Sequence, residues 1–172
     1  YVSQLSTPII FQPIDPSDFP EWLPAGTINI NTSGNLVDGK MIRSINRIDI
    51  GGNTEFYVHG GGQVHLYVSE IINVSGTASI GTDANTELLL YYDNDDTITF
   101  NGTPNSKISI YAPDARINYN GGGAGETIVG SFICDTFDGP DSNCVIAQNT
   151  AFSMDDLLID GVAGYTRTVW SK

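Results

Sequence analysis

The chain has 172 residues and carries 20 acidic side chains against 7 basic ones, giving a net charge of −13 at pH 7. This length fits one domain with a sizeable core. The acidic balance argues against nucleic acid as a partner, because affinity for a phosphate backbone depends on Lys and Arg. The composition, 40% hydrophobic with a mean hydropathy of −0.07, is that of a folded globular protein. No run of about 18 apolar residues occurs, so we expect no membrane span.

The first 26 residues differ in composition from the rest of the chain. The chain starts with Tyr1 rather than Met, which suggests a fragment or a processed product. Frequent proline blocks both helices and strand ladders, so residues 1–26 are expected to be an extended segment that wraps over one face or one end of the fold. The prolines of this segment are Pro8, Pro13, Pro16, Pro20 and Pro24, and its apolar anchors are Phe11, Phe19 and Trp22.

Residues 27–152 consist of short runs of alternating polar and apolar residues, separated by Gly and Asn turns. Alternation with period two is typical of half-buried strands. Three runs share a similar apolar triplet: Leu66-Tyr67-Val68, Leu90-Tyr91-Tyr92 and Ile110-Tyr111-Ala112. Their first tyrosines are 24 (91 − 67) and 20 (111 − 91) residues apart. A period of this length is typical of stacked coils. The sequence therefore predicts an all-β, single-domain β-solenoid (β-helix) with coils of about 20–24 residues.

The last 20 residues read as a cap for the solenoid. Ser153 and Asp156 are spaced as in a helical capping box, and Gly161 follows as a stop signal. The run from Tyr165 to Trp170 then alternates like a strand. We therefore expect residues 153–172 to form a short helix and a strand that cover the open end of the coils.

Alternation along the runs predicts which side chains face the core. Leu66, Leu90 and Ile110 are expected to stack inward in consecutive coils, which directs the neighbouring tyrosines outward. Outward tyrosines at coil spacing would form a ladder on one flat side: Tyr67, Tyr91 and Tyr111. Such a ladder suits sugar rings, which stack on aromatic faces. The alternative is a ladder that packs on itself or beneath the proline-rich segment, because an exposed aromatic stripe is costly unless it is used or covered.

Two groups of acidic residues are candidate cation ligands. Asp93, Asp95 and Asp96 lie in one turn, and hard oxygen ligands at close spacing can hold calcium. The turn lacks the Gly and the distal Glu of an EF-hand loop, so a solvated turn is the alternative. The second group is Asp135, Asp138 and Asp141, for which the alternative is again a solvated loop. No cofactor other than calcium is expected.

Cys134 and Cys144 flank a loop rich in turn-forming residues. A disulfide between them is geometrically easy and predicts an oxidising compartment, whereas two free thiols are the alternative. The two histidines, His59 and His65, flank a triple glycine without a metal-ligand motif. Both are expected on the outward face as ordinary surface residues.

Several short motifs resemble a known type of domain. They are Ile110-Tyr111-Ala112-Pro113-Asp114-Ala115, then Ile128-Val129-Gly130, and then the stretch from Asn149 to Asp155-Asp156-Leu157. Over roughly residues 45–160 the chain resembles a β-solenoid domain of undefined function found in bacterial cell-surface and type IV pilus-associated proteins. That domain is often joined to an N-terminal pilin-like segment. The resemblance implies an extracytoplasmic location and no catalytic residues.

We therefore expect a non-catalytic structural or adhesion domain of a bacterial surface or pilus-associated protein, at the cell surface, in a pilus or secreted. Its expected partners are other pilus or cell-surface components and glycans. Two alternatives remain open. One is a carbohydrate-binding module that uses the tyrosine ladder. The other is a polysaccharide-acting β-helix enzyme, since such enzymes use carboxylates on an outer face and this chain is rich in them.

Overall fold

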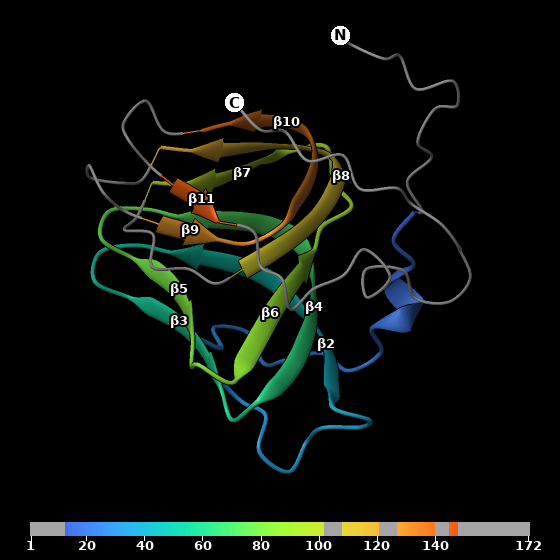
Figure 1. Cartoon of the computed structure of the whole chain (residues 1–172). Helices are drawn as coiled ribbons and strands as arrows, with labels where there is room; N and C mark the ends of the chain where they lie inside the picture. The colour runs from blue at the N-terminus through green and yellow to red at the C-terminus, as the bar shows by residue number, and fades with distance from the viewer. Residues whose placement is uncertain (1–12, 102–107, 121–126, 140–144, 148–172) are drawn as a thin grey trace, which may run out of the picture.

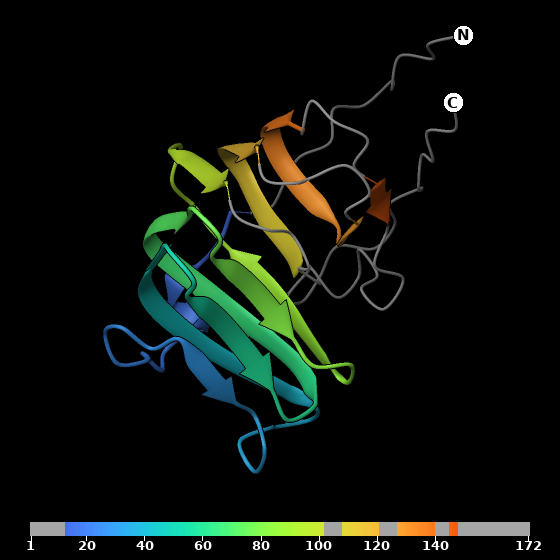
Figure 2. The ribbon, with the colours of Figure 1, turned by 90° about the vertical axis from the view of Figure 1, so that its left-hand side faces the viewer.

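The computed structural model describes residues 13–101, 108–120, 127–139 and 145–147. In this part of the chain the one regular helix is a three-residue 3-10 turn, η1 (Pro16–Asp18), and every pair of named strands is parallel. The strands stack as a β-solenoid of about four turns, which confirms the predicted fold class. Figure 2 shows the stack, with the blue N-terminal strands at its lower end and the orange C-terminal strands at its upper end.

The strands form three sheets. The largest has the order β10-β8-β6-β4-β2, with β7 pairing to β4 and β8, and the smaller ones are β1-β3-β5 and β11-β9. The strands are β1 (Asn29–Asn31), β2 (Lys40–Ile50), β3 (Glu55–His59), β4 (Gly62–Val74), β5 (Ser79–Thr82), β6 (Thr86–Tyr91), β7 (Thr97–Phe100), β8 (Ile108–Tyr119), β9 (Thr127–Val129), β10 (Phe132–Asp138) and β11 (Val145–Ala147).

The predicted coil length is confirmed by the strand register. The spacings are 23 for Met41–Val64 (64 − 41), 24 for Val64–Leu88 (88 − 64), 20 for Leu88–Ile108 (108 − 88) and 22 for Ile110–Phe132 (132 − 110). The turns between the strands, together with register shifts within two of the strand pairs, absorb the differences in coil length. One such turn, residues 92–96, separates β6 from β7 where the neighbouring coils have one continuous strand.

Each long strand serves two faces of the solenoid. Register shifts interrupt β2 between Ile45 and Arg47, and β10 between Cys134 and Thr136. A bulge bends its strand, and Figure 1 shows β4, β8 and β10 curving around a corner. We call the face before the bend the tyrosine face (residues 40–45, 63–68, 87–91, 108–112 and 132–134). The face after the bend is the polar face (residues 47–50, 71–74, 97–100, 116–119 and 136–138).

The core fills the interior of the coils with apolar side chains. Leu66 pairs in register with Leu90, and Leu90 with Ile110, and all three are buried. The predicted inward stack is therefore confirmed. Buried side chains on the strands of the other faces, such as Ile72, Ile98 and Phe56, complete the same cluster.

The end of the proline-rich segment lies on the outside of the stack. We call residues 13–23 the strap; η1 belongs to it and lies beside β2 and β4 in Figure 1. Leu23 donates its backbone N–H to Ser44 O at 2.7 Å, and Ser44 donates to Glu21 O at 2.8 Å. Phe19 is buried, as an anchor should be, but Trp22 is 53% exposed, so the expectation that it packs is wrong. Phe11 and the predicted cap at 153–172 lie outside the described residues.

Candidate functional site

The three predicted tyrosines lie in one column across three coils. Tyr67 is the register partner of Tyr91, and Tyr91 is the partner of Tyr111. The ring centroids of Tyr91 and Tyr111 are 6.0 Å apart. The ladder predicted from the sequence therefore exists.

This column is covered rather than open. The exposed fractions of Tyr67, Tyr91 and Tyr111 are 5%, 3% and 4%. The Phe19 ring of the strap lies 5.6 Å from the Tyr67 ring and 4.9 Å from the Tyr91 ring, measured between centroids. Because the rings are buried, the predicted sugar-binding surface is not open to a ligand in this structure. Of the alternatives given by the sequence, the covered ladder is the one observed.

A second column runs beside the tyrosines on the same face. It consists of Ile42, His65, Leu89 and Ser109 in register. Leu89 and Ser109 are fully buried and His65 is 2% exposed, so the expectation that His65 is a surface residue is wrong. The Nδ1 atom of His65 lies 3.0 Å from the Tyr91 hydroxyl. The tyrosine face thus carries a second hydrophobic layer outside the main core, made of Phe19, Tyr67, Leu89, Tyr91 and Tyr111.

His59 lies on the face formed by β1, β3 and β5. Its side chain is partly exposed, and its Nε2 atom is 3.0 Å from Asn29 Oδ1 on β1. Its ring stacks on that of Tyr57, with 5.5 Å between centroids and 21° between planes. Its position on an outward face agrees with the sequence, although the side chain is engaged with two neighbours.

The acidic turn contacts the tyrosine column through one of its members. The Tyr67 hydroxyl donates to Asp93 Oδ1 at 2.9 Å. Burial, followed by this hydrogen bond and the charge of Asp93, raises the pKa of Tyr67 to about 12. Asp95 and Asp96 are exposed, and no group of three His, Cys, Asp or Glu side chains that could hold a metal occurs among the described residues. The predicted calcium site therefore gains no geometric support and stays a prediction.

Cys134 is a free thiol in this structure. Its half-buried side chain packs against the main core, as do the rings of Phe132 and Phe137. Burial, and secondarily the charge of Asp135, raises the pKa of the thiol. The predicted bridge from Cys134 to Cys144 is therefore not shown. Cys144 itself lies outside the described residues, as does Asp141 of the second acidic group.

The polar face is the surface that the sequence analysis missed. Two outward columns run along it, and one of them continues in register through five strands: Asp49, Asn73, Thr99, Asn118 and Asp138. The other contains the pair Arg47–Ile71 and the run Thr97–Arg116–Thr136. All ten side chains are exposed or partly exposed. Neighbouring strands lie about 4.8 Å apart, so the face repeats polar groups at that spacing.

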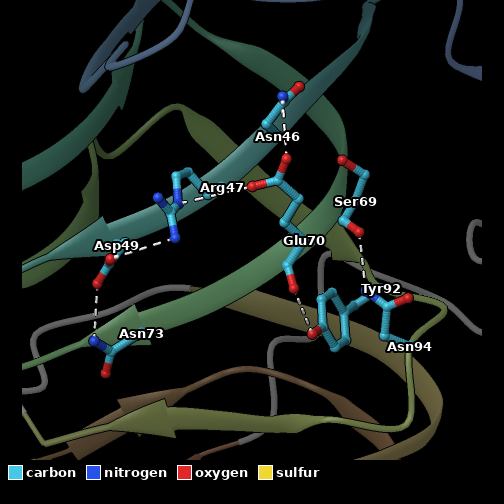
Figure 3. A network of polar contacts seen from close by, with 8 residues as sticks. All are labelled: Asn46, Arg47, Asp49, Ser69, Glu70, Asn73, Tyr92 and Asn94. Atoms are coloured by element: carbon cyan, nitrogen blue, oxygen red, sulfur yellow. Dashed lines mark hydrogen bonds and ion pairs between the residues drawn. The ribbon is translucent and has the colours of Figure 1, made fainter.

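Neighbouring polar side chains on this face bind one another, as Figure 3 shows. The Arg47 guanidinium lies 3.8 Å from Asp49 Oδ2 and 3.9 Å from Glu70 Oε2, and Asn73 donates to Asp49 Oδ1 at 2.9 Å. Asn46 donates to Glu70 Oε1 at 3.3 Å. Arg116 and Asp138 form a second ion pair farther along the face. The side chains are therefore held in an ordered array while remaining accessible to a partner.

Two side-chain hydrogen bonds fix the corner from which this array projects. Tyr92 is fully buried, and its hydroxyl donates to the backbone carbonyl of Glu70 at 3.0 Å. Asn94 donates its side-chain N–H to Ser69 O at 2.9 Å. Both contacts tie the turn after β6 to the bend of β4, as the close view in Figure 3 shows. These two hydrogen bonds therefore hold the corner in place.

One signal for the polar face was present in the sequence. Four of its five strands carry two polar or charged residues around one apolar residue, as in Thr97-Ile98-Thr99 and Arg116-Ile117-Asn118, whereas β4 has Ile71-Ile72-Asn73 there. Aligning the strands by coil length would have placed these residues in columns. The bulges hide this pattern, because they reverse the inward and outward positions within one strand.

Comparison with known proteins identifies the family and no more. No curated protein and no solved structure matches the chain. Among the described residues no helix is long and apolar enough to cross a membrane. A family model described as "Domain of unknown function (DUF7305)" matches residues 24–158, which include the whole described solenoid from β1 to β11. The chain belongs to this family of domains of unknown function.

Proposed function

We propose that this chain is a non-catalytic structural and adhesion domain of an extracytoplasmic bacterial protein, acting among pilus or other cell-surface components. The observation that supports adhesion is the polar face, whose ten outward side chains are aligned over five strands and accessible. The tyrosine face is covered by the strap, so the polar face is the better candidate for contact with a partner.

The form of the polar face favours binding over catalysis. Catalytic sites surround their substrates and exclude water, and small-molecule ligands usually bury most of their surface in a concave pocket. The outward side chains of a parallel sheet form an open surface, and here they are short or paired with one another. Such a surface suits an extended partner that makes many weak polar contacts.

A surface or pilus location is proposed from the sequence resemblance to domains of bacterial envelope proteins. The low content of basic residues, 7 against 20 acidic ones, fits a domain that does not bind nucleic acid. Fractionation of cells that express the full-length protein tests the location. Recovery of the protein in the cytoplasmic fraction would contradict this part of the proposal.

Carbohydrate binding is a second candidate, and the polar face now supports it in place of the tyrosines. Amides, hydroxyls and carboxylates in register, such as Asn73, Thr99 and Asp138, can exchange hydrogen bonds with the repeated hydroxyl groups of a glycan. The polysaccharide-acting enzyme remains the third candidate, and the same experiment separates all three.

The experiment applies the labelled domain to a glycan array and to immobilised bacterial cell-surface fractions. The test variant, Thr99→Arg with Asn118→Arg, adds two positive charges in the middle of the polar face. The matched control, Glu55→Arg, makes the same charge change at an exposed position on β3. We expect the test variant to lose binding to cell-surface protein and the control to keep it.

Each other outcome has a defined meaning. Retention of a glycan that the test variant no longer retains would favour the carbohydrate-binding module. Release of reducing ends would establish an enzyme and contradict the proposal. Binding to no cell-surface fraction, or equal binding by the test variant and the control, would contradict adhesion through this face.

A further inference from the structure

The N-terminal end of the solenoid has an edge strand that is only partly covered. β2 is the last strand of the large sheet, so one side of it pairs with β4 and the other side faces the end of the stack. The strap bonds to this free side at one residue, Ser44, through Glu21 O and Leu23 N. The strap therefore covers the edge where β2 serves the tyrosine face and not where it serves the polar face.

Hydrogen-bond alternation shows which backbone groups face the free side. The carbonyl of Ile50 accepts from Ser75 N at 2.9 Å, so the backbone of Ile50 points toward the β4 coil. Successive residues of a strand point to opposite sides, so Ile48 points the same way and Arg47 and Asp49 point outward from the sheet edge. Apart from the strand ladders, no backbone hydrogen bond within the described residues involves the N–H or C=O of Arg47 or Asp49. These two residues present an open edge.

Exposed apolar side chains gather at the same end of the stack. Within the described residues the exposed large hydrophobic side chains are Trp22, Ile28 and Val37, at 53%, 43% and 74%. All three belong to the segments that lead into β1 and β2. Trp22 forms a bridge with Ser44 of β2, and Val37 pairs with Lys40 at the start of β2. A partner that docks on this end would cover apolar surface together with the open edge.

We propose that the occupant of this edge is a second copy of the chain, paired antiparallel along Arg47–Asp49 with a two-fold axis at Ile48. In that pairing Arg47 of each copy lies opposite Asp49 of the other, and Ile48 lies opposite its own equivalent. Arg47 and Asp49 both direct their backbone groups outward, so each such pair exchanges two N–H to C=O hydrogen bonds. The edge is complementary to itself in hydrogen bonding, which a two-fold interface requires.

The side-chain charges are also complementary to themselves. Directly opposite residues lie on the same face of a sheet, so each Arg47 guanidinium would meet an Asp49 carboxylate of the other copy. Within one copy these groups are 3.8 Å apart, with 56% and 42% of their side chains exposed. An exposed ion pair of this kind is weak in water and can exchange partners at little cost. A parallel pairing, or a pairing shifted by one residue, would lose this match of charges.

A charge-exchange series measured by analytical ultracentrifugation tests the proposal. We expect the wild-type domain to form dimers as its concentration is raised. Arg47→Asp alone and Asp49→Arg alone place like charges opposite each other and should weaken the dimer about tenfold or more. The double variant with both substitutions restores the match and should restore the dimer. Arg116→Asp, an exposed arginine on the same face but on the interior strand β8, is the control and should dimerise like the wild type.

Disulfide trapping gives a second measurement that does not depend on affinity. The background carries Cys134→Ser and Cys144→Ser. Opposite residues in a hydrogen-bonded antiparallel pair have Cα atoms about 5.5 Å apart, within the range of a disulfide. A mixture of Arg47→Cys and Asp49→Cys should cross-link as a heterodimer, and either variant alone should not. A monomer at all concentrations, no rescue by the double variant, or equal cross-linking of Arg47→Cys with itself would overturn the proposal.

Discussion

The ring of Phe19 lies against the ring of Tyr91, with 4.9 Å between the centroids and 56° between the planes. One residue belongs to the proline-rich strap and the other to β6, more than 70 positions later in the chain. Tilted aromatic contacts of this kind add to the stabilisation from burial. Together with the Tyr67 contact, this relationship attaches the strap to the coils.

Removal of the Phe19 ring should detach the strap. We expect Phe19→Ala to lower the free energy of unfolding by about 3–5 kcal/mol, as is usual for a buried phenylalanine, and to expose the tyrosines to solvent. Urea unfolding and second-derivative tyrosine absorbance measure the two effects. Trp22→Ala is the control, because Trp22 is 53% exposed and its loss should cost about 0.5 kcal/mol or less. Equal effects of the two substitutions would contradict the covered ladder.

The inward stack makes a separate prediction for Leu90. This side chain is fully buried between its register partners Leu66 and Ile110. Leu90→Ala should therefore lower the free energy of unfolding by about 2–5 kcal/mol through lost burial and a cavity. Thr97→Ala on the polar face is the control, since Thr97 is exposed. An unchanged midpoint of urea unfolding for Leu90→Ala would mean that the register is wrong.

The hydroxyl of Tyr67 should lose its proton at a higher pH than an ordinary tyrosine. Burial and the contact with Asp93 raise its pKa from 10.0 to about 12. The folded state thus holds this proton more tightly than the unfolded state, so the stabilisation is complete below pH 10 and is lost as the pH rises toward 12. Tyrosinate absorbance, compared with Tyr67→Phe, identifies the group.

Asp93→Asn tests the causes of this shift. It removes the charge of Asp93, so it should lower the pKa of Tyr67. The pKa should stay above 10.0, because burial is the largest cause of the shift. A return to 10.0 in Asp93→Asn would mean that the ring is not buried.

The Cys134 thiol should react slowly in the folded protein. Burial and the neighbouring Asp135 raise its pKa, which lowers the thiolate fraction at neutral pH. We expect alkylation of Cys134 to be slow in native buffer and fast in urea without reductant, as read by intact mass and peptide mapping. A requirement for reductant before Cys134 is alkylated would show that it forms a disulfide in solution.

Coil length and core register could be predicted because they depend on short-range alternation. The triplet Leu90-Tyr91-Tyr92 lies 24 residues after one equivalent and 20 residues before the next, and the strands pair at these spacings. Whether the tyrosine rings are exposed or covered could not be predicted in the same way. Alternation places Tyr91 outward, but whether an outward ring is covered depends on a segment far away in the sequence, here the one that carries Phe19.

The two histidines also show that the sequence does not reveal whether an outward side chain is covered. His59 and His65 have similar sequence surroundings, and both point away from the main core. His59 remains partly exposed beside Asn29, whereas His65 is buried in the second layer near Tyr91. The polar face was missed for another reason. The register shift at Ile45/Arg47 reverses which residues face outward, and a bulge has no clear signature in a single sequence.

The strap has a mechanical consequence. In a stack of coils each coil touches only its neighbours, so tension on one end would peel the coils off one at a time. The strap binds β2 through Ser44, β4 through Tyr67 and β6 through Tyr91. A pull transmitted through the residues before the strap would therefore load three coils together before it could unwind the first.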